Sequence, residues 1–190
     1  MSDDAYYLRV ATWEDVAALR ALIAASVGGL QTEYTEAQRE GALGHVLGLD
    51  TQLIADETYF MATVDGMPVA SGGWSYRATL FGSDDGPNRV PAVLDPARDA
   101  AKIRAIFVHP AWARRGLGTR LLRHCEAAAR DAGFVRVEMG STLTGVPLYQ
   151  REGYVATGRV EVPLPNGEHL VIVPMEKALL GCAAVRRPGS

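Results

Sequence analysis

The clearest hydrophobic pattern in the sequence lies between residues 101 and 132. Residues 102–108 alternate in polarity and are rich in β-branched and aromatic side chains, which predicts a strand closed by His109-Pro110. Farther on, apolar residues recur at helical spacing as far as Gly133, where a helix is expected to stop. These apolar positions are Leu117, Leu121, Leu122, Cys125, Ala128, Ala129 and Ala132. A strand, a glycine-containing turn at 114–119 and a helix are therefore expected in direct succession.

Upstream of this segment, periodicity and turn residues predict a strand, two longer helices, a short helical piece and a β-hairpin. The first helix follows a capping pattern that begins at Thr12, and Thr35 with Gln38 forms a capping box for the second. The first expected elements are a strand at 6–10 and a helix that ends at a break at Gly28-Gly29. A second helix through Leu43, Val46 and Leu47 and a helical piece at 51–55 follow. The hairpin strands are expected at 58–64 and 68–76, joined by a turn at Asp65-Gly66.

Downstream, the pattern predicts a strand at 134–139 and a short helix that begins near Pro147 and ends at Gly153. A strand at 154–162 is then expected to turn at Asn166-Gly167 and return at 170–175. The segment 77–99 carries several glycines, prolines and aspartates, so no long regular element is expected there. We interpret it as a flap beside a binding site, with a plain surface excursion as the alternative.

Strands that alternate with helices in the middle of the chain and form hairpins at both ends indicate one mixed sheet with helices on both faces. The fold class expected is therefore mixed α/β, or α+β, in a single domain over 1–180, with 181–190 as a loose C-terminal tail.

Composition and charge narrow the function classes. The chain has 190 residues, 48% of them hydrophobic and 22% charged, as in an ordinary globular domain. A formal net charge of -3 gives no case for a nucleic-acid partner. Cys125 and Cys182 are far apart, and the histidines are isolated, so neither a disulfide framework nor a metal site is expected. No signal peptide or membrane span is expected either, which favours a cytoplasmic protein without a membrane partner.

The glycine turn has the chemistry of an anion site. Glycines at 116 and 118 allow backbone N–H groups to converge, and the unpaired N–H groups and positive dipole end of the following helix point the same way. Arg114 and Arg115 add positive charge, which favours a diphosphate over a carboxylate. The turn is not a Walker loop, since Gly118 is followed by Thr119-Arg120, and it lacks the third glycine of the dinucleotide fingerprint.

This stretch resembles the acyl-CoA-binding motif Q/R-x-x-G-x-G/A of the GNAT superfamily of N-acetyltransferases, although Ala113 stands at the Q/R position. The segment 103–110 is similar to the central strand of that family, and 148–154, Leu-Tyr-Gln-Arg-Glu-Gly-Tyr, is similar to its closing motif. All three occur in the family's order and spacing.

The resemblance implies a sheet whose central strands splay apart, with acetyl-CoA, and no metal, in the wedge between 103–108 and 135–139. It implies that main-chain groups of the first strand pair with the pantetheine amides, and that an N–H near Phe107 or Val108 receives the oxyanion. It also implies that Tyr149 protonates the leaving thiolate. The cofactor-binding residues expected are Ile106, Phe107, Val108, Arg114, Arg115, Gly116, Leu117, Gly118 and Thr119.

Residues for the acceptor and the general base are less defined. Glu33 and Tyr34 fall in a segment that lines the acceptor pocket in relatives, and Trp74 and Tyr76 could shape the same pocket, with solvated-turn and core roles as the alternatives. The central strand carries no glutamate, and a structural role is favoured for His109, so the base is left open.

Two functions are compatible with these features. The first is an N-acetyltransferase that moves an acetyl group from acetyl-CoA to a primary amine of a small molecule or peptide, by direct attack in a ternary complex. The second is a non-catalytic acyl-CoA-binding or sensing module. Tyr149 favours the first, and a homodimer is left open.

Overall fold

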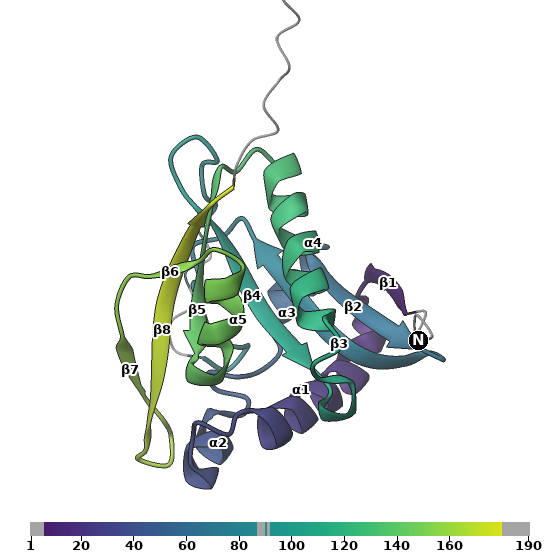
Figure 1. The fold of residues 1–190 in the computed structure, drawn as a ribbon, viewed down its shortest axis with the longest axis vertical. Coiled ribbons are helices and arrows are strands. Elements are labelled where there is room, and N and C mark those ends of the chain that lie inside the picture. Colours follow the sequence, from purple (N-terminus) through teal and green to yellow (C-terminus); the bar gives the residue numbers. More distant parts are fainter. Residues whose placement is uncertain (1–5, 87–89, 91, 180–190) are drawn as a thin grey trace, which may run out of the picture.

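The structure is a computed structural model that describes residues 6–86, 90 and 92–179. An open eight-stranded mixed sheet forms its centre, in the order β1-β2-β3-β4-β5-β8-β6, with β7 paired to β8 (Figure 1). The expected fold class is confirmed. The expected C-terminal tail at 181–190 lies outside the described residues, and no described helix has the length and apolar character needed to cross a membrane.

The first four strands form an antiparallel half-sheet. They are β1 (Tyr7–Val10), β2 (Tyr59–Val64), β3 (Met67–Ser75) and β4 (Ala101–Val108). The hairpin between β2 and β3 turns at Asp65 and Gly66, which have φ angles of 49° and 79°. Both angles lie in the left-handed region that this tight turn requires, so the expected hairpin is confirmed.

The two central strands diverge. β4 is parallel to β5 (Arg136–Thr142), but only Ala101 pairs with Val137 and Lys102 with Glu138. Beyond these two pairs, the edge of β4 that faces β5 has no strand partner, although both strands continue for several residues. The sheet therefore splays as the family resemblance implied, and it leaves main-chain groups of β4 available along the opening.

β4 also carries a bulge that the sequence pattern did not predict. Ser71 pairs with Phe107 and Gly73 with Arg104, so β4 has one residue more than β3 between these pairs. Ala105 lies in this bulge and has a φ angle of 52°, in the left-handed region. On β3 the bulge faces Gly72, where a Cβ atom would lie 2.9 Å from Cγ1 of Ile106.

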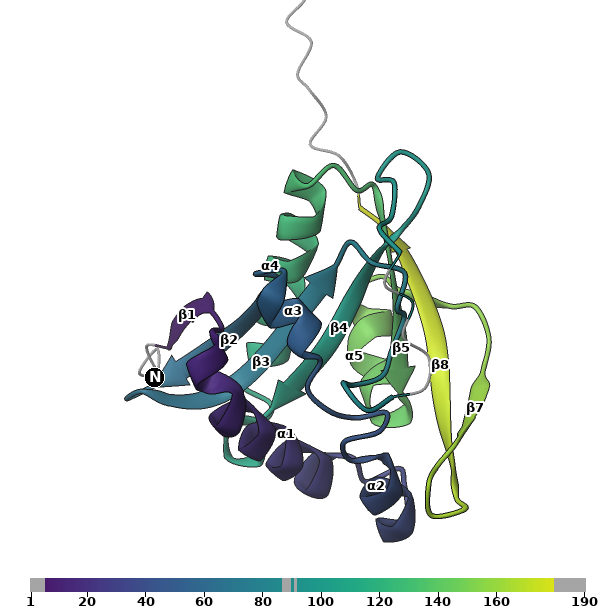
Figure 2. The same cartoon turned by 180° about the vertical axis from the view of Figure 1, so that it is seen from behind.

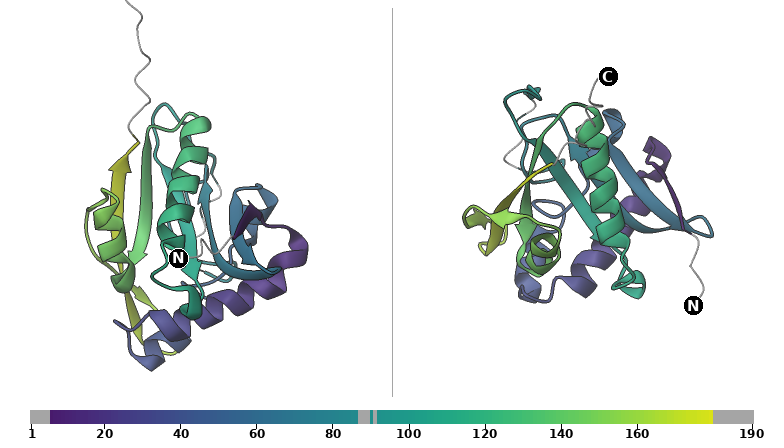
Figure 3. Two further views of the ribbon diagram at one scale, coloured as in Figure 1. Left: turned by 45° about the vertical axis from the view of Figure 1, so that its right-hand side comes forward. Right: turned by 45° about the horizontal axis from the view of Figure 1, so that its top comes forward.

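Helices cover both faces of the sheet. α4 (Leu117–Asp131) and α5 (Val146–Arg151) lie on one face, and α1 (Val16–Leu30), α2 (Glu36–Ala42) and α3 (Thr51–Ala55) lie on the other (Figures 1 and 2). Figure 3 shows the sheet and the helices on its two faces from oblique directions. Short 3-10 turns at Trp13–Asp15, Pro110–Trp112 and Leu143–Gly145 precede α1, α4 and α5.

Each face has its own hydrophobic cluster. On the α4 side, Leu121, Leu122 and Cys125 are buried against the sheet with Ile103 and Met139. On the α1 side, Leu19, Leu22 and Ile23 pack with Tyr59 and Phe107 in a second cluster. Burying a large aliphatic side chain contributes about 1.5–3 kcal/mol, so these two clusters fix α4 and α1 against the same strands.

The C-terminal half ends in one long strand, β8 (His169–Ala178), which pairs with β5, with β6 (Val155–Ala156) and with β7 (Val160–Pro163). The prediction of one continuous strand at 154–162 is wrong, because the structure has two short strands there, β6 and β7. Ala156 pairs with Met175 and Val160 with Ile172, so the β6–β7 side has one extra residue and its pairing is interrupted.

The predicted helix break at Gly28-Gly29 is also wrong, because α1 continues to Leu30. A Cβ atom at Gly29 would lie 2.5 Å from Cγ of Pro110, so the glycine allows close packing of α1 against the 3-10 turn after β4. The second helix is shorter than predicted and ends at Ala42. Gly44 follows at a φ of 80°, which ends the helix before Leu47.

A buried ion pair joins three segments behind the splayed strands. Arg104 of β4 donates to Asp50 Oδ2 at 2.9 Å and to the carbonyl oxygens of Thr79 and Gly82 at 2.9 and 2.8 Å. Asp50 also caps α3 by accepting from the N–H of Gln52 at 3.1 Å. The two charged side chains are only 3% and 4% exposed. β4, α3 and the segment after β3 are therefore held by one charged cluster.

Asp50→Asn should destabilise the fold by about 3 kcal/mol, because it removes the carboxylate charge that faces the buried guanidinium of Arg104. Urea unfolding monitored by circular dichroism measures the change. The control is Glu152→Gln, which removes the partner of the exposed Arg123 and should lower the free energy of unfolding by less than about 1 kcal/mol. Equal effects of the two substitutions would contradict the role given to the buried pair.

Candidate functional site

The predicted anion turn at 114–119 follows β4 after the 3-10 turn Pro110–Trp112. Arg114 and Gly116 have φ angles of 62° and 80°, so the chain reverses through the left-handed region immediately before α4. Gly116 is the N-cap of α4 and supplies no side-chain acceptor for the first N–H groups of the helix. These N–H groups and the helix dipole are therefore available to an anion.

A groove of about 740 Å³ lies directly in front of this turn. Arg114, Gly116, Gly118 and Thr119 line one part of it, and Val108 at the end of β4 lines another. The facing walls come from the C-terminal end of α1, at Gly29 and Leu30, from Thr32 after it, and from Thr144, Leu148 and Arg151 in and before α5. The glycine turn therefore opens onto a cavity large enough for an extended ligand.

The expected cofactor-binding residues divide between this groove and a second hollow. Val108, Arg114, Gly116, Leu117, Gly118 and Thr119 line the groove, whereas Ile106 and Phe107 line a smaller cavity in the splay. Arg115 is not among the lining residues, and its guanidinium lies 4.5 Å from the centre of the Trp112 ring. Arg120 extends toward the ring of Tyr6 at 5.4 Å.

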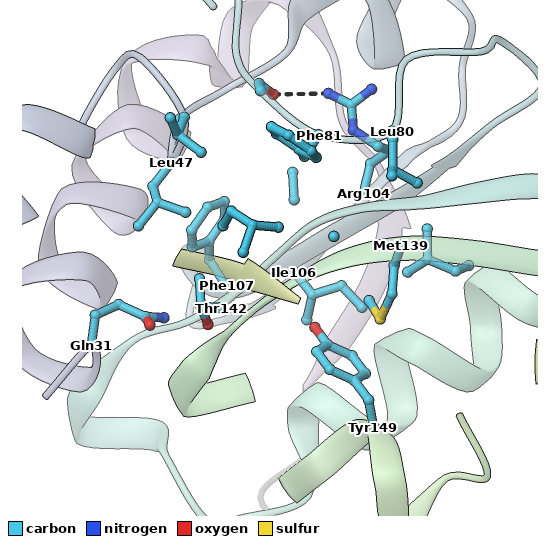
Figure 4. Close-up of a pocket in the computed structure, with 17 residues that line it drawn as sticks. Gln31, Leu47, Leu80, Phe81, Arg104, Ile106, Phe107, Met139, Thr142 and Tyr149 are labelled. Carbon is cyan, nitrogen blue, oxygen red and sulfur yellow. Dashed lines mark hydrogen bonds between the residues drawn. The ribbon is translucent and has the colours of Figure 1, made fainter. Parts of the chain in front are cut away.

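The smaller cavity, of about 70 Å³, lies between the diverging strands (Figure 4). In three pairs of consecutive residues, one residue lines the groove and the other lines this cavity. The pairs are Val108 and Phe107 of β4, Leu148 and Tyr149 of α5, and Leu30 and Gln31 at the end of α1. The two hollows therefore adjoin along a line that crosses β4, α5 and α1.

Tyr149 reaches the cavity from α5, and its hydroxyl points toward Ile106 (Figure 4). The residue is 7% exposed, and its ring packs edge-on against Tyr154 with 5.8 Å between the centroids. Its hydroxyl forms no hydrogen bond with the described residues. Burial raises the pKa of the Tyr149 phenol, so it stays protonated at neutral pH and can donate a proton into the cavity.

The predicted acceptor residues do not line the cavity. Glu33 is exposed, and Tyr34 is buried, with its hydroxyl donating to Val171 O at 2.6 Å and accepting from Leu143 N–H at 2.8 Å. Trp74 is buried against Phe134 and Tyr76 with edge-on ring contacts. In this structure Tyr34 ties the segment after α1 to β8 and to the turn before α5.

Part of the predicted flap at 77–99 does enter the cavity. Leu80, Phe81 and Gly82 line it, and Arg104 holds Gly82 in place through the carbonyl oxygen. A Cβ atom at Gly140 of β5 would lie 2.9 Å from Cδ1 of Phe81, so this ring packs directly on the splayed strand. Pro87 and Pro91 of the same segment lie outside the described residues.

His109 has the structural role that the sequence favoured. Its Nδ1 accepts from the N–H of Ala111 at 3.2 Å and so caps the 3-10 turn after β4. No Asp, Glu or His is among the described residues that line the cavity. A search of the described part of the chain finds no group of three or more residues suited to hold a metal ion.

Sequence reasoning missed two polar residues that line the hollows, Gln31 and Thr144, and a third, Ser26, that bonds to a lining residue. Ser26 of α1 accepts from the N–H of Val108 at 3.3 Å. Gln31 Oε1 in the cavity and Thr144 Oγ1 in the groove are buried without a hydrogen-bond partner among the described residues. Such atoms are rare in folded proteins, and both face a hollow. No local sequence pattern marks these residues, because their positions depend on how α1 and α5 pack.

Comparison with known proteins places these features in a family. Residues 88–179 match the model described as the acetyltransferase (GNAT) domain, a stretch that includes β4, the glycine turn, α4, β5 and α5. Among the curated proteins, no match is found.

Many solved structures share the fold. A GCN5-related N-acetyltransferase from Rhodopseudomonas palustris is 24% identical, with a TM-score of 0.68 over 94% of this chain and 99% of that one. PaiA N-acetyltransferase from Thermoplasma acidophilum, solved with coenzyme A, is 12% identical, with a TM-score of 0.62 over 92% and 99%. YncA from Salmonella typhimurium, solved with acetyl-CoA, is 19% identical, with a TM-score of 0.60 over 98% and 99%.

The matched model covers the segments on which the sequence resemblance rested, and the fold extends the agreement over nearly the whole chain. The splayed strands and the glycine turn that opens onto a groove are the structural counterparts of those segments. On these grounds, residues 88–179 match the GNAT acetyltransferase domain, and nearly the whole chain has the fold of solved N-acetyltransferases.

Proposed function

We propose that the protein transfers an acetyl group from acetyl-CoA to a primary amine by direct attack in a ternary complex. One observation carries this proposal: the groove before the glycine turn adjoins the cavity that contains the Tyr149 hydroxyl. A donor bound in the groove and an acceptor in the cavity would meet at the line between them. Holding two reactants in contact supplies a large part of the rate enhancement in such reactions.

The groove fits the coenzyme A part of the donor. The uncapped N–H groups at the start of α4 and the exposed Arg114 suit the diphosphate. The edge of β4 that faces β5 has no strand partner beyond Lys102, and it suits the amides of the pantetheine arm, which can pair there as a strand would. Thr144 Oγ1 offers one more polar contact, and its lack of a protein partner supports a ligand at this wall.

The reaction itself requires few protein groups. The amine nitrogen bonds to the thioester carbonyl carbon, the carbon–sulfur bond breaks, and the Tyr149 hydroxyl donates its proton to the leaving thiolate. The attacking nitrogen loses a proton to water, and Tyr149 regains its proton from solvent. Val108 N–H is proposed as the oxyanion donor, since its bond to Ser26 Oγ is long at 3.3 Å and can be exchanged for a shorter, charge-assisted one.

A thiol-release assay separates this function from a non-catalytic acyl-CoA-binding module. The enzyme should release coenzyme A from acetyl-CoA only when a suitable amine is added, and mass spectrometry should find the acetylated amine. Tight acetyl-CoA binding without amine-dependent thiol release over a broad panel would support the binding module instead.

Gly118→Val should weaken acetyl-CoA binding by about tenfold or more, because a branched side chain would enter the groove where the backbone approaches the ligand. A Cβ atom at this position meets Leu148 Cδ2 at 3.5 Å and Val108 Cγ2 at 3.7 Å, which are ordinary contacts, so the variant should fold. Isothermal titration calorimetry measures the affinity. Gly158→Val, in a loop where a Cβ atom meets nothing within 4 Å, is the control. Unchanged affinity in a folded Gly118 variant would remove the turn from the binding site.

Tyr149→Phe should lower kcat by about a hundredfold, the usual contribution of a general acid, with little change in acetyl-CoA affinity. The substitution removes no hydrogen bond between described residues, so stability should be retained. Stopped-flow kinetics under conditions where chemistry limits turnover measures the effect, with Tyr7→Phe on the exposed β1 edge as the control. An unaltered rate would make Tyr149 a packing residue.

The rate should depend on pH through the acceptor amine. No Asp, Glu or His is among the described residues that line the cavity, so we expect the amine to bind as the free base and kcat/KM to rise about tenfold per pH unit toward the amine's own pKa, near 10. Burial raises the pKa of Tyr149, so its proton should remain available where an exposed tyrosine would ionise, at about pH 10. Initial rates at saturating acetyl-CoA test this, and a falling limb below that pH would contradict it.

A further inference from the structure

The side-chain carbonyl oxygen of Gln31 is the least explained polar atom in the cavity. Gln31 follows α1 as its C-cap residue, and its Oε1 is buried without a hydrogen-bond partner among the described residues. The side chain lies at the cavity wall contributed by α1 and is drawn with Phe107, Thr142 and Tyr149 in Figure 4. A buried acceptor without a donor costs about 1–3 kcal/mol, so a ligand that donates a hydrogen bond would relieve this cost.

The backbone of Gln31 is held firmly. Its carbonyl oxygen accepts from Tyr34 N–H at 3.3 Å and from Arg39 Nη1 at 3.5 Å. Tyr34 in turn is fixed through its hydroxyl to Val171 and Leu143. The turn formed by residues 31–34 therefore positions the Gln31 amide at the cavity, and hydrogen bonds of Tyr34 connect this turn to β8 and to the segment before α5.

The cavity offers no free charge to a ligand. Arg104 is the one charged residue among the described residues that line it, and its guanidinium is 3% exposed and engaged by Asp50, Thr79 and Gly82. The remaining polar side chains that line it are Gln31, Thr142 and Tyr149. Thr142 Oγ1 is occupied as the acceptor of Gly145 N–H at 3.2 Å.

Most of the lining is apolar. Leu47, Leu80, Phe81, Met139 and Ile172 surround the space, whose volume is about 70 Å³. A cavity of about 150 Å³ is large enough for benzene, so this one suits a short aliphatic group. A carboxylate or a second ammonium group would enter this space without a counter-charge, at a large desolvation cost.

We propose that Gln31 Oε1 accepts a hydrogen bond from the acceptor's amine nitrogen, and that the acceptor is a primary amine on a short, uncharged aliphatic body. This inference rests on the proposed acetyl transfer. The amine donates one N–H to Gln31, which aligns its lone pair toward the groove, while the aliphatic body fills the apolar part of the cavity. Amino acids and diamines are disfavoured, because the described lining residues offer no charged side chain that could pair with a carboxylate or a second ammonium group.

Two matched pairs of amines test the substrate class on the unaltered chain. Isobutylamine and valine share an isopropyl group and differ by a carboxylate, and butylamine and putrescine differ by a second amine. We expect kcat/KM for the monoamines to exceed that for valine and putrescine by roughly a hundredfold. Equal or better turnover of valine or putrescine would overturn the assignment of the substrate class.

Gln31→Leu tests the residue, because leucine keeps the apolar volume and removes the acceptor. We expect kcat/KM for isobutylamine to fall roughly tenfold through a higher KM for the amine, with unchanged affinity for acetyl-CoA. Gln150→Leu makes the same change at an exposed position beside Tyr149 and should leave both values unaltered. Gln31→Met is a second variant of similar length, for the case that the leucine variant does not fold.

The outcomes separate the two proposals. If no amine is acetylated although acetyl-CoA binds, the proposed function itself fails. If amines are acetylated but Gln31→Leu and Gln31→Met behave as Gln150→Leu does, acetyl transfer stands and the role of Gln31 is overturned.

Discussion

The early separation of β4 and β5 is the constraint on which the rest of the structure depends. Only Ala101 and Lys102 of β4 pair with β5, at Val137 and Glu138, and the two strands then diverge. A sheet interior normally leaves no main-chain group without a partner, so a central strand with an open edge requires another group to complete it. In this chain the opening leads on one side to the groove before α4 and on the other to the apolar cavity.

An opening inside a sheet must be kept from closing, and several contacts do this. On the α1 side, the buried pair of Arg104 and Asp50 fastens β4 to α3 and to the segment that carries Phe81. On the same face of the sheet, Tyr34 joins the segment after α1 to β8 and to the turn before α5. Elements from distant parts of the sequence therefore hold the two halves of the sheet at a fixed separation, which preorganises the hollows between them.

The chemistry proposed for this opening relies on placement more than on reactive side chains. In the proposed reaction, burial keeps Tyr149 neutral, a main-chain group acts as the oxyanion donor, and the attacking amine supplies its own lone pair. Such a site has to exclude water and to hold the reactants close together in the correct orientation. In this proposal, the cavity residues that do not react, among them Gln31 and Phe81, decide which amine can enter.

The sequence by itself determined the mixed sheet, the β2–β3 hairpin, the Thr35 capping box and the glycine turn before α4. These depend on local periodicity and turn chemistry, or on the spacing of three motifs. Only the tertiary structure decided that Gly29 serves close packing against Pro110, that Ala105 forms a bulge, and that Gln31 and Thr144 face the hollows. Those features arise where segments remote in the chain meet, and a pattern read along one segment holds no information about its neighbours in space.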